Sequence, residues 1–218
     1  MRTLLLAVAC ALVVAGAATA DHLDPQERIR APDQKRAAAI LLRKADLPQG
    51  YEPERTSDLD PHFTCSALDE SDLVLSGRAK SPYWAREYQI VGSSSAVYRT
   101  ARDSGAAWLR STSTVGRKCV RDEFRKAFAR QGETMRIAVG EIALPRLAVT
   151  AKAFRLAISG ADPRQPPLLF IDVVLMHHGR AHVGLLFAGV VAPPARATEI
   201  ALSRLVAQRI AAAMRGAS

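Results

Sequence analysis

The stretch Leu168-Leu169-Phe170-Ile171-Asp172-Val173-Val174-Leu175-Met176 decides the fold class, because it is apolar on both faces apart from Asp172. A strand of this composition belongs at the centre of a sheet that is covered on both sides. Further strand-like segments precede and follow it, and the connections between them are short. Short connections join antiparallel neighbours, since a parallel return needs a long crossover. These strand-like segments and the turn signals between them are 134–142, Pro145, 147–158, Gly160–Pro167, Gly179 and 181–190.

The first half of the chain adds two strands and the chain as a whole adds helices. We expect strands at 72–78 and 85–98, the second broken near Gly92, and helices at 33–44, from Asp103, from about Arg117 to Gly132, and at 193–214. Asp33 is the expected N-cap of the first helix. In the last helix the polar residues expected to lie outside are Arg196, Glu199, Arg204 and Arg215. The sequence therefore predicts an α+β domain: an antiparallel sheet of four to six strands, flanked by helices, with the N-terminal and C-terminal helices packing on the sheet.

The first twenty residues have the pattern of an export signal. Arg2 supplies the positive charge, an uncharged apolar run follows, and Ala18-Thr19-Ala20 presents small side chains before Asp21. We expect cleavage after Ala20, with residues 21–32 as a flexible tether and 33–218 as a single domain. An uncleaved membrane anchor is the alternative, and Cys10 raises a lipoprotein cleavage as a third; no other window has the length of a membrane span.

Composition fits a secreted globular protein. The chain has 218 residues, 49% apolar, which excludes disordered, collagenous, disulfide-dense and polytopic membrane proteins. Export would leave Cys65 and Cys119, and two cysteines in an oxidising compartment are expected to form a disulfide, with two separate buried thiols as the alternative.

The positive charge is a weak guide to partners. The net charge is +9, but 24 of the 30 basic residues are Arg and the chain has no Asn, which is typical of a GC-rich bacterial genome. We expect no nucleic-acid partner, and an anionic cell-envelope component or a small ligand instead. Arg117, Arg121 and Arg125 recur every fourth residue; a solvated helix face is the simpler interpretation and a dedicated anion site the alternative.

Three segments and the end of the chain resemble a known family. Leu47-Pro48-x-Gly50-Tyr51 follows the first expected helix, Cys65 precedes Leu73-Val74-Leu75-Ser76-Gly77, and residues 91–98 read Val-Gly-Ser-Ser-Ser-Ala-Val-Tyr. With the closing hairpin and helix, they resemble exported actinobacterial sensor-type domains. Those domains occur on small secreted or lipid-anchored proteins and on the outside of membrane Ser/Thr kinases, with a fold similar to PsbP-type proteins. The resemblance covers most of residues 33–215; it implies a binding or sensing role and supplies no catalytic residue.

His177-His178-Gly179-Arg180-Ala181-His182 is the most suggestive motif for chemistry. If Gly179-Arg180 forms a two-residue turn, His177 and His182 lie opposite each other on paired strands and could share a metal; a turn at His178-Gly179 would pair His177 with Arg180 instead. Zinc needs three or four protein ligands, and no third is evident, so polar residues at a hairpin tip are the simpler interpretation.

Asp172 and a group of aromatic residues are the other candidates. Asp172 is either a structural carboxylate paired with an Arg of a neighbouring strand, such as Arg155, or an acid with a perturbed pKa. Tyr83, Trp84 and Tyr88 are either a stacking platform for a sugar or flat ligand, or packing under a loop.

No nucleophile–base motif, phosphate loop or dinucleotide fingerprint is present. The sequence therefore predicts a secreted bacterial extracytoplasmic binding or sensor-like domain without catalytic activity or cofactor. Its candidate ligand-binding residues are Tyr83, Trp84, Asp172, His177 and His182. The alternative is a secreted metal-assisted hydrolase that uses His177 and His182.

Overall fold

A computed structural model describes residues 23–54 and 65–216 of the chain. The predicted leader and its cleavage site, residues 1–20, lie outside the described residues. No helix within the described ranges is long and apolar enough to cross a membrane.

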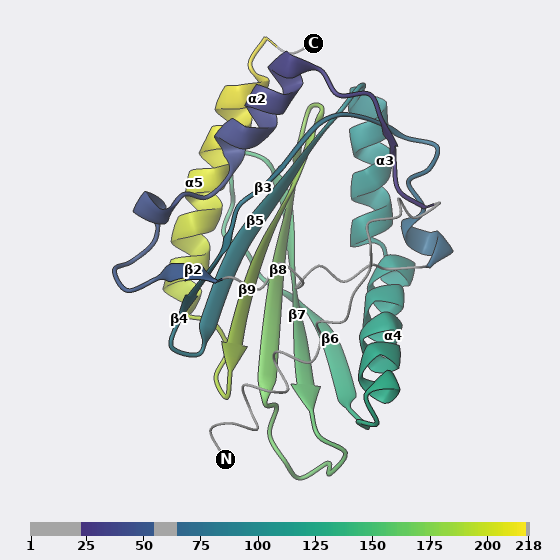
Figure 1. The fold of residues 1–218 in the computed structure, drawn as a ribbon, viewed down its shortest axis with the longest axis vertical. Helices are drawn as coiled ribbons and strands as arrows, with labels where there is room; N and C mark the ends of the chain where they lie inside the picture. The colour runs from purple at the N-terminus through teal and green to yellow at the C-terminus, as the bar shows by residue number, and fades with distance from the viewer. Residues whose placement is uncertain (1–22, 55–64, 217–218) are drawn as a thin grey trace.

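A single sheet of nine strands forms the centre of the molecule (Figure 1). Its order is β1-β3-β5-β9-β8-β7-β6, with β4 pairing with β5 and β2 pairing with β4. Every pairing is antiparallel except that of β1 with β3. The strands are β1 (Gln26–Glu27), β2 (Glu52–Glu54), β3 (Val74–Lys80), β4 (Tyr83–Arg86), β5 (Gln89–Tyr98), β6 (Arg136–Ile142), β7 (Thr150–Ser159), β8 (Leu169–His178) and β9 (Ala181–Val190).

The α+β class is confirmed, but the prediction of four to six strands is wrong. The six long strands lie close to their predicted positions, and the three additional ones, β1, β2 and β4, have only two to four residues each. The predicted strand 85–98 is a hairpin whose turn lies at Glu87, which has a left-handed φ of 54°. Gly92, where the break was expected, lies within the continuous strand β5.

Within the described residues, four α-helices pack on this sheet: α2 (Ala31–Ile40), α3 (Ala101–Thr112), α4 (Thr114–Arg130) and α5 (Arg196–Met214). Two helices begin at hydroxyl caps, because Thr100 accepts a hydrogen bond from the backbone N–H of Asp103, and Ser113 accepts one from that of Gly116. Two short 3₁₀ helices, η1 (Lys44–Asp46) and η2 (Ser66–Leu68), lie in the connections. Helix α2 starts before Asp33, so this residue lies in its first turn and is not the N-cap.

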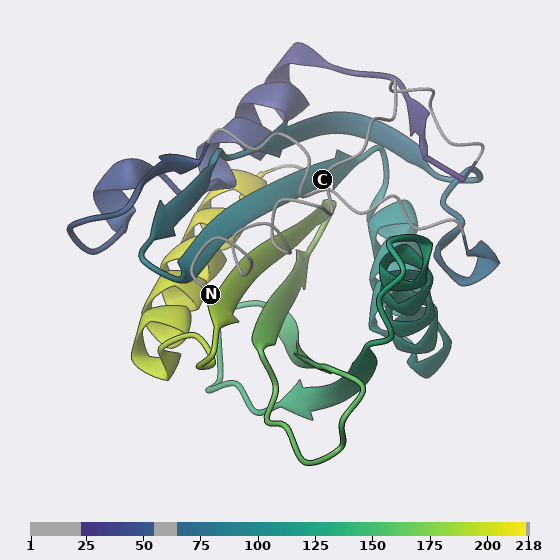
Figure 2. The same ribbon diagram turned by 60° about the horizontal axis from the view of Figure 1, so that its bottom comes forward.

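The helices cover both faces of the sheet, as the apolar β8 sequence predicted (Figure 2). On the α2–α5 face, α2 and α5 pack against a large cluster of fully buried side chains that includes Ile40, Val183, Leu185, Val206 and Ile210. On the α3–α4 face, α4 packs through Phe128 against smaller clusters, and several strand side chains stay half-buried. Alternate residues of each central strand therefore face a closed layer and a more open one.

Candidate ligand groove

A groove of about 460 Å³ opens on the α3–α4 face, between the central strands and the helices. Four strands of the sheet, β5, β9, β8 and β7, contribute to its floor, while α4 and η2 line the opposite wall. Cavities of this size with mostly apolar walls and a few polar groups are the usual form of small-molecule sites. The lining residues are Asp24, Leu68, Glu70, Lys80, Tyr83, Gly92, Ser93, Ser94, Ser111, Val120, Phe124, Leu156, Ile171, Val173, Leu175, Gly184, Leu185 and Leu186.

The register of the sheet explains why these residues meet. Ser94 of β5 lies opposite Gly184 of β9, which lies opposite Leu175 of β8. The next row on the same face begins at Gly92, which lies opposite Leu186, and Leu186 lies opposite Val173. Because alternate side chains share a face, two adjacent cross-strand rows form one continuous floor.

Two residues of that floor are glycines, and a neighbouring side chain approaches each of them closely. A Cβ at Gly92 would lie 2.5 Å from the ring of Tyr83, so the ring occupies the place of a side chain. A Cβ at Gly184 would lie 3.2 Å from the Ser94 hydroxyl oxygen and 3.8 Å from a methyl carbon of Leu175. Neither glycine has a positive φ, so the close approach of neighbouring side chains, rather than backbone conformation, accounts for both residues.

The rim on the helix side is held by a disulfide. Cys65 and Cys119, the predicted pair, are bonded with their Cα atoms 6.2 Å apart, and this links η2 to α4. Glu70 follows η2, and its carboxylate accepts a hydrogen bond of 2.6 Å from the Tyr98 hydroxyl. Burial raises the pKa of Glu70 and outweighs the lowering by the Tyr98 hydrogen bond and the Arg110 charge. The groove wall is therefore anchored covalently and by hydrogen bonds.

The two predicted histidines lie together beneath α3. His177 pairs with His182 across the β8–β9 turn at Gly179-Arg180, which is the first of the two registers considered. The Trp108 ring stacks on His177 at 5.9 Å and meets His182 edge-on at 6.1 Å. Burial first, and then the charge of His177, lower the pKa of His182 to about 4. Burial likewise lowers the pKa of His177, ahead of the charge of His178.

The surroundings of the histidines favour packing over chemistry. No three His, Cys, Asp or Glu side chains gather as metal ligands within residues 23–54 and 65–216. Ser111, which lines the groove, places its hydroxyl oxygen 3.4 Å from His182 Nε2, but this hydroxyl also donates to the Trp108 carbonyl at 3.1 Å. An imidazole whose pKa is about 4 is a weak base at neutral pH.

Asp172 lies between the groove-lining residues Ile171 and Val173 of β8, but its side chain points to the opposite face of the sheet, into the α2–α5 layer. The predicted partner Arg155 donates to both of its carboxylate oxygens, at 2.7 and 2.5 Å. Asp172 has no exposed surface, and Glu199 of α5, also with none, contacts it. The expectation that Glu199 lies outside the fold is therefore wrong.

The pKa of Glu199 is raised into the neutral range, so this buried carboxyl group is only partly ionised near pH 7. Burial, and then the contact with Asp172, raise its pKa to about 7, although Arg196 opposes this shift. Its Oε2 accepts a hydrogen bond of 2.7 Å from Arg196, and within the described chain Oε1 finds no donor. A proton on Glu199 lets this carboxyl group donate to Asp172, which removes the repulsion between two buried carboxylates.

The three aromatic residues do not form one platform. Tyr83 faces the groove, where its ring covers Gly92, whereas Trp84 is buried on the opposite face in the α2–α5 cluster. Tyr88 is 56% exposed in the β4–β5 turn. Only Tyr83 of the three lines the groove.

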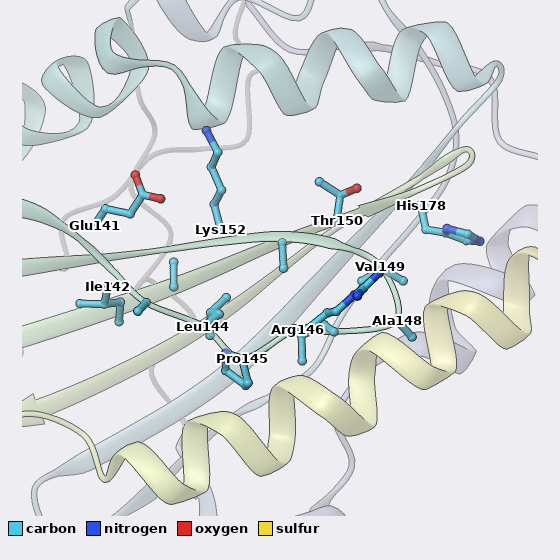
Figure 3. A pocket seen from close by; sticks show the side chains of 14 residues that line it. Glu141, Ile142, Leu144, Pro145, Arg146, Ala148, Val149, Thr150, Lys152 and His178 are labelled. Carbon is cyan, nitrogen blue, oxygen red and sulfur yellow. The ribbon is translucent and has the colours of Figure 1, made fainter.

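A second hollow, of about 670 Å³, lies beside the connection between β6 and β7 (Figure 3). Glu141 and Lys152 point toward the helix on one side of the sheet, whereas Leu144, Pro145 and Arg146 lie on the side of α5. Because its polar side chains diverge, this hollow is less suited to a ligand than the groove.

The three arginines that recur along α4 make two kinds of contact, with an acidic side chain of the same helix and with an aromatic ring of the sheet. Arg121 and Arg125 both contact Asp122, at 3.1 and 3.4 Å, and Lys118 reaches the same carboxylate at 2.8 Å. The Arg117 guanidinium instead lies 4.8 Å from the centre of the Phe154 ring. These contacts give a dedicated anion site no support.

Sequence reasoning missed most of the groove. Its floor depends on Gly184 and on the half-buried residues Leu175 and Leu186. In the sequence these three residues look like ordinary members of the expected strands. A signal was present, because one side of β9 is small at Gly184 and Ala188 while the other side carries Val183, Leu185 and Phe187. Lys80 and Glu70 gave no such signal, since only the fold brings them to one rim.

Comparison with known proteins places the fold. No protein-family model matches the chain, and no curated protein matches it by sequence. Among solved structures, it is similar to the extracellular domain of PknH from Mycobacterium tuberculosis, with a TM-score of 0.50 and 9% sequence identity. The match covers 84% of this chain and 96% of that domain, so the two share a fold over most of their length.

Proposed function

We propose that the chain is an extracytoplasmic binding domain, without catalytic activity, that holds a ligand in the groove on its α3–α4 face. The observation that carries the proposal is the groove floor, where Val173, Leu175 and Leu186 stay half-buried at the centre of a sheet. Apolar side chains at such positions are normally covered by a packed layer. A ligand that covers them removes their exposed apolar surface from water, which favours binding.

The setting supports an extracytoplasmic role. The similar fold belongs to a domain described as extracellular, and the Cys65–Cys119 disulfide suits an oxidising compartment. The predicted leader agrees with both. If export removes it after Ala20, protein recovered from the culture medium or envelope begins at Asp21, and N-terminal sequencing tests this; an intact leader on cytoplasmic protein would contradict it.

The groove is tested with a neutral apolar probe, N-phenyl-1-naphthylamine, whose fluorescence rises in apolar surroundings. Gly184→Val places a branched side chain on the floor, and valine suits a strand. Gly140→Val is the matched control, because Gly140 also lies within a strand and a Cβ there meets no atom within 4 Å.

We expect the unmodified chain and Gly140→Val to bind the probe equally, and Gly184→Val to bind about tenfold more weakly or not at all, because overfilling a packed site is unfavourable. Thermal unfolding shows that each variant is folded. If the folded unmodified chain does not bind the probe, or Gly184→Val binds as well as Gly140→Val, the groove is not the site.

A further inference from the structure

The groove has a polarity that changes with depth. Ile171 and Leu156, at the base, are buried, and Val173, Leu175 and Leu186 beside them are half-buried. Among the polar lining residues, Asp24, Lys80 and Ser94 are exposed, whereas Ser93 is buried and its hydroxyl accepts a hydrogen bond from the Leu42 backbone N–H. A ligand that fits this arrangement has an apolar part that is covered and a polar part that stays near solvent.

The apolar floor is long in one direction. It crosses from β5 through β9 and β8 to β7, four neighbouring strands of the sheet. Adjacent strands lie about 4.8 Å apart, so this floor extends for roughly 14 Å. Gly184 adds no side chain to this floor, whereas the Tyr83 ring covers Gly92 at its β5 end. Such a trough has the length for a single extended alkyl chain.

The rim carries charges of both signs together with hydroxyl groups. Lys80 supplies a cation from β3, while Glu70 and Asp24 supply carboxylates. Tyr83, Ser94 and Ser111 add hydroxyls. A charged head group of either sign would meet both a like and an opposite charge at this rim, so its charge brings little net attraction, whereas a neutral polyhydroxyl head both donates and accepts hydrogen bonds there.

From this juxtaposition we infer that the groove takes a single-chain amphiphile with an uncharged, hydroxyl-bearing head group, such as an alkyl glycoside. The alkyl chain lies on the floor formed by Leu175, Leu186 and Val173, and the head lies at the rim beside Lys80, Ser94 and Tyr83. This inference rests on the proposed binding function and names the class of ligand.

Isothermal titration calorimetry on the full chain tests it with four probes, each kept below the concentration at which it forms micelles. Octyl β-glucoside carries the neutral head, octanoate an anionic head, and octyltrimethylammonium a cationic head on the same eight-carbon chain, while glucose is the head alone. We expect octyl β-glucoside to bind at least about tenfold more tightly than either charged probe, and glucose to show no measurable binding.

Variants place the binding. Gly184→Val should weaken octyl β-glucoside binding by about tenfold or more, and Gly140→Val should leave it unchanged, because only the first fills the floor. Octyl β-glucoside should also displace N-phenyl-1-naphthylamine from the unmodified chain. Tighter binding of octanoate or of the ammonium probe, or binding of glucose as tight as that of octyl β-glucoside, would overturn the inference.

The two proposals can fail separately. If the naphthylamine probe binds in a Gly184-dependent manner while octyl β-glucoside neither binds nor displaces it, the binding function stands and the ligand class is wrong. If neither probe binds the folded chain, both proposals fail.

Discussion

Leu185 and Leu186 are neighbours in strand β9, yet they face different environments. Leu185 has no exposed surface and lies within the α2–α5 cluster, whereas Leu186 stays half-buried on the floor of the groove. The same strands therefore build one face that excludes water and another that leaves apolar surface open. The first face gains stability from burial, and the second retains surface on which a ligand can gain affinity.

The two faces also treat charge differently. On the α2–α5 face, Asp172 and Glu199 are fully buried and are compensated by Arg155, by Arg196 and by a proton. On the α3–α4 face, Lys80 and Asp24 lie exposed at a rim where water can solvate them. Polar groups thus stabilise helix docking on one face and surround an opening on the other.

The largest expected effect comes from removing the disulfide, which belongs to the open face alone. The Cys65→Ser/Cys119→Ser variant releases a link across 54 residues, for which the loop-entropy model gives a loss of roughly 4 kcal/mol in the free energy of unfolding. Urea denaturation of the variant and of the reduced parent chain measures this. Since η2 also loses its anchor to the groove wall, naphthylamine binding should weaken together with stability.

Equal stability of the oxidised and reduced chains would show that the link does not support the open face. Thiol labelling of the parent chain without reductant is the control, because the native disulfide leaves neither Cys65 nor Cys119 reactive, and Cys10 is the third cysteine of the sequence.

Truncation of the two neighbouring leucines compares the faces directly. Leu185→Ala creates a cavity in a fully buried cluster and should cost about 3 kcal/mol, whereas Leu186→Ala removes a side chain that is already half-open and should cost about 1 kcal/mol. Chemical denaturation of both variants measures the difference. Equal losses would mean that the α3–α4 face is as tightly packed as the other.

The faces should also respond to pH in opposite directions. The fold favours protonated Glu199, so its contribution to stability is complete below pH 4.5 and is lost as the pH rises through 7. The fold disfavours protonated His182, so its contribution is present above pH 6.5 and is lost as the pH falls through 4. The two dependences partly cancel in the parent chain.

Single variants separate these dependences. Relative to Glu199→Gln, the parent chain should lose on the order of 2 kcal/mol between pH 4.5 and pH 8, because one pKa unit corresponds to about 1.4 kcal/mol. Relative to His182→Gln, the parent chain should instead gain stability as the pH rises from 4 to 6.5. If the difference in unfolding free energy between the parent chain and a variant does not vary with pH, folding does not shift the pKa of the substituted group.

The sequence predicted what depends on local periodicity. The apolar run around Asp172 indicated a central strand with a buried charge, and cross-strand pairing indicated Arg155 as its partner. Glu199 could not be predicted in this way, because a glutamate among charged residues of a helix normally faces solvent. Only the docking of α5 over β8 brings it against Asp172.

The groove and the short strands could not be predicted from the sequence for a related reason: both depend on contacts between distant segments. The floor requires Gly184 of β9 to lie beside Ser94 of β5, which is a matter of register between distant segments. Strands β1, β2 and β4 have too few residues to show a period of two; β1 and β4 form beside the long strands β3 and β5, and β2 forms beside β4.

The smallest expected effects lie on helix α4, where one row of arginines spans the boundary between the open face and solvent. Arg121→Gln and Arg125→Gln should each change the free energy of unfolding by less than about 0.5 kcal/mol, because both side chains form partly exposed ion pairs with Asp122. Arg117→Gln should cost about 1 kcal/mol, since the Arg117 guanidinium packs on the Phe154 ring and lies 3.8 Å from Glu141.

Thermal denaturation at low and high salt separates the two cases: the Phe154 contact persists in salt, whereas the surface pairs are screened. Equal and salt-sensitive losses of stability at all three positions would show that the three arginines act as one charged surface. The packing of Arg117 on the strands of the α3–α4 face would then contribute nothing measurable.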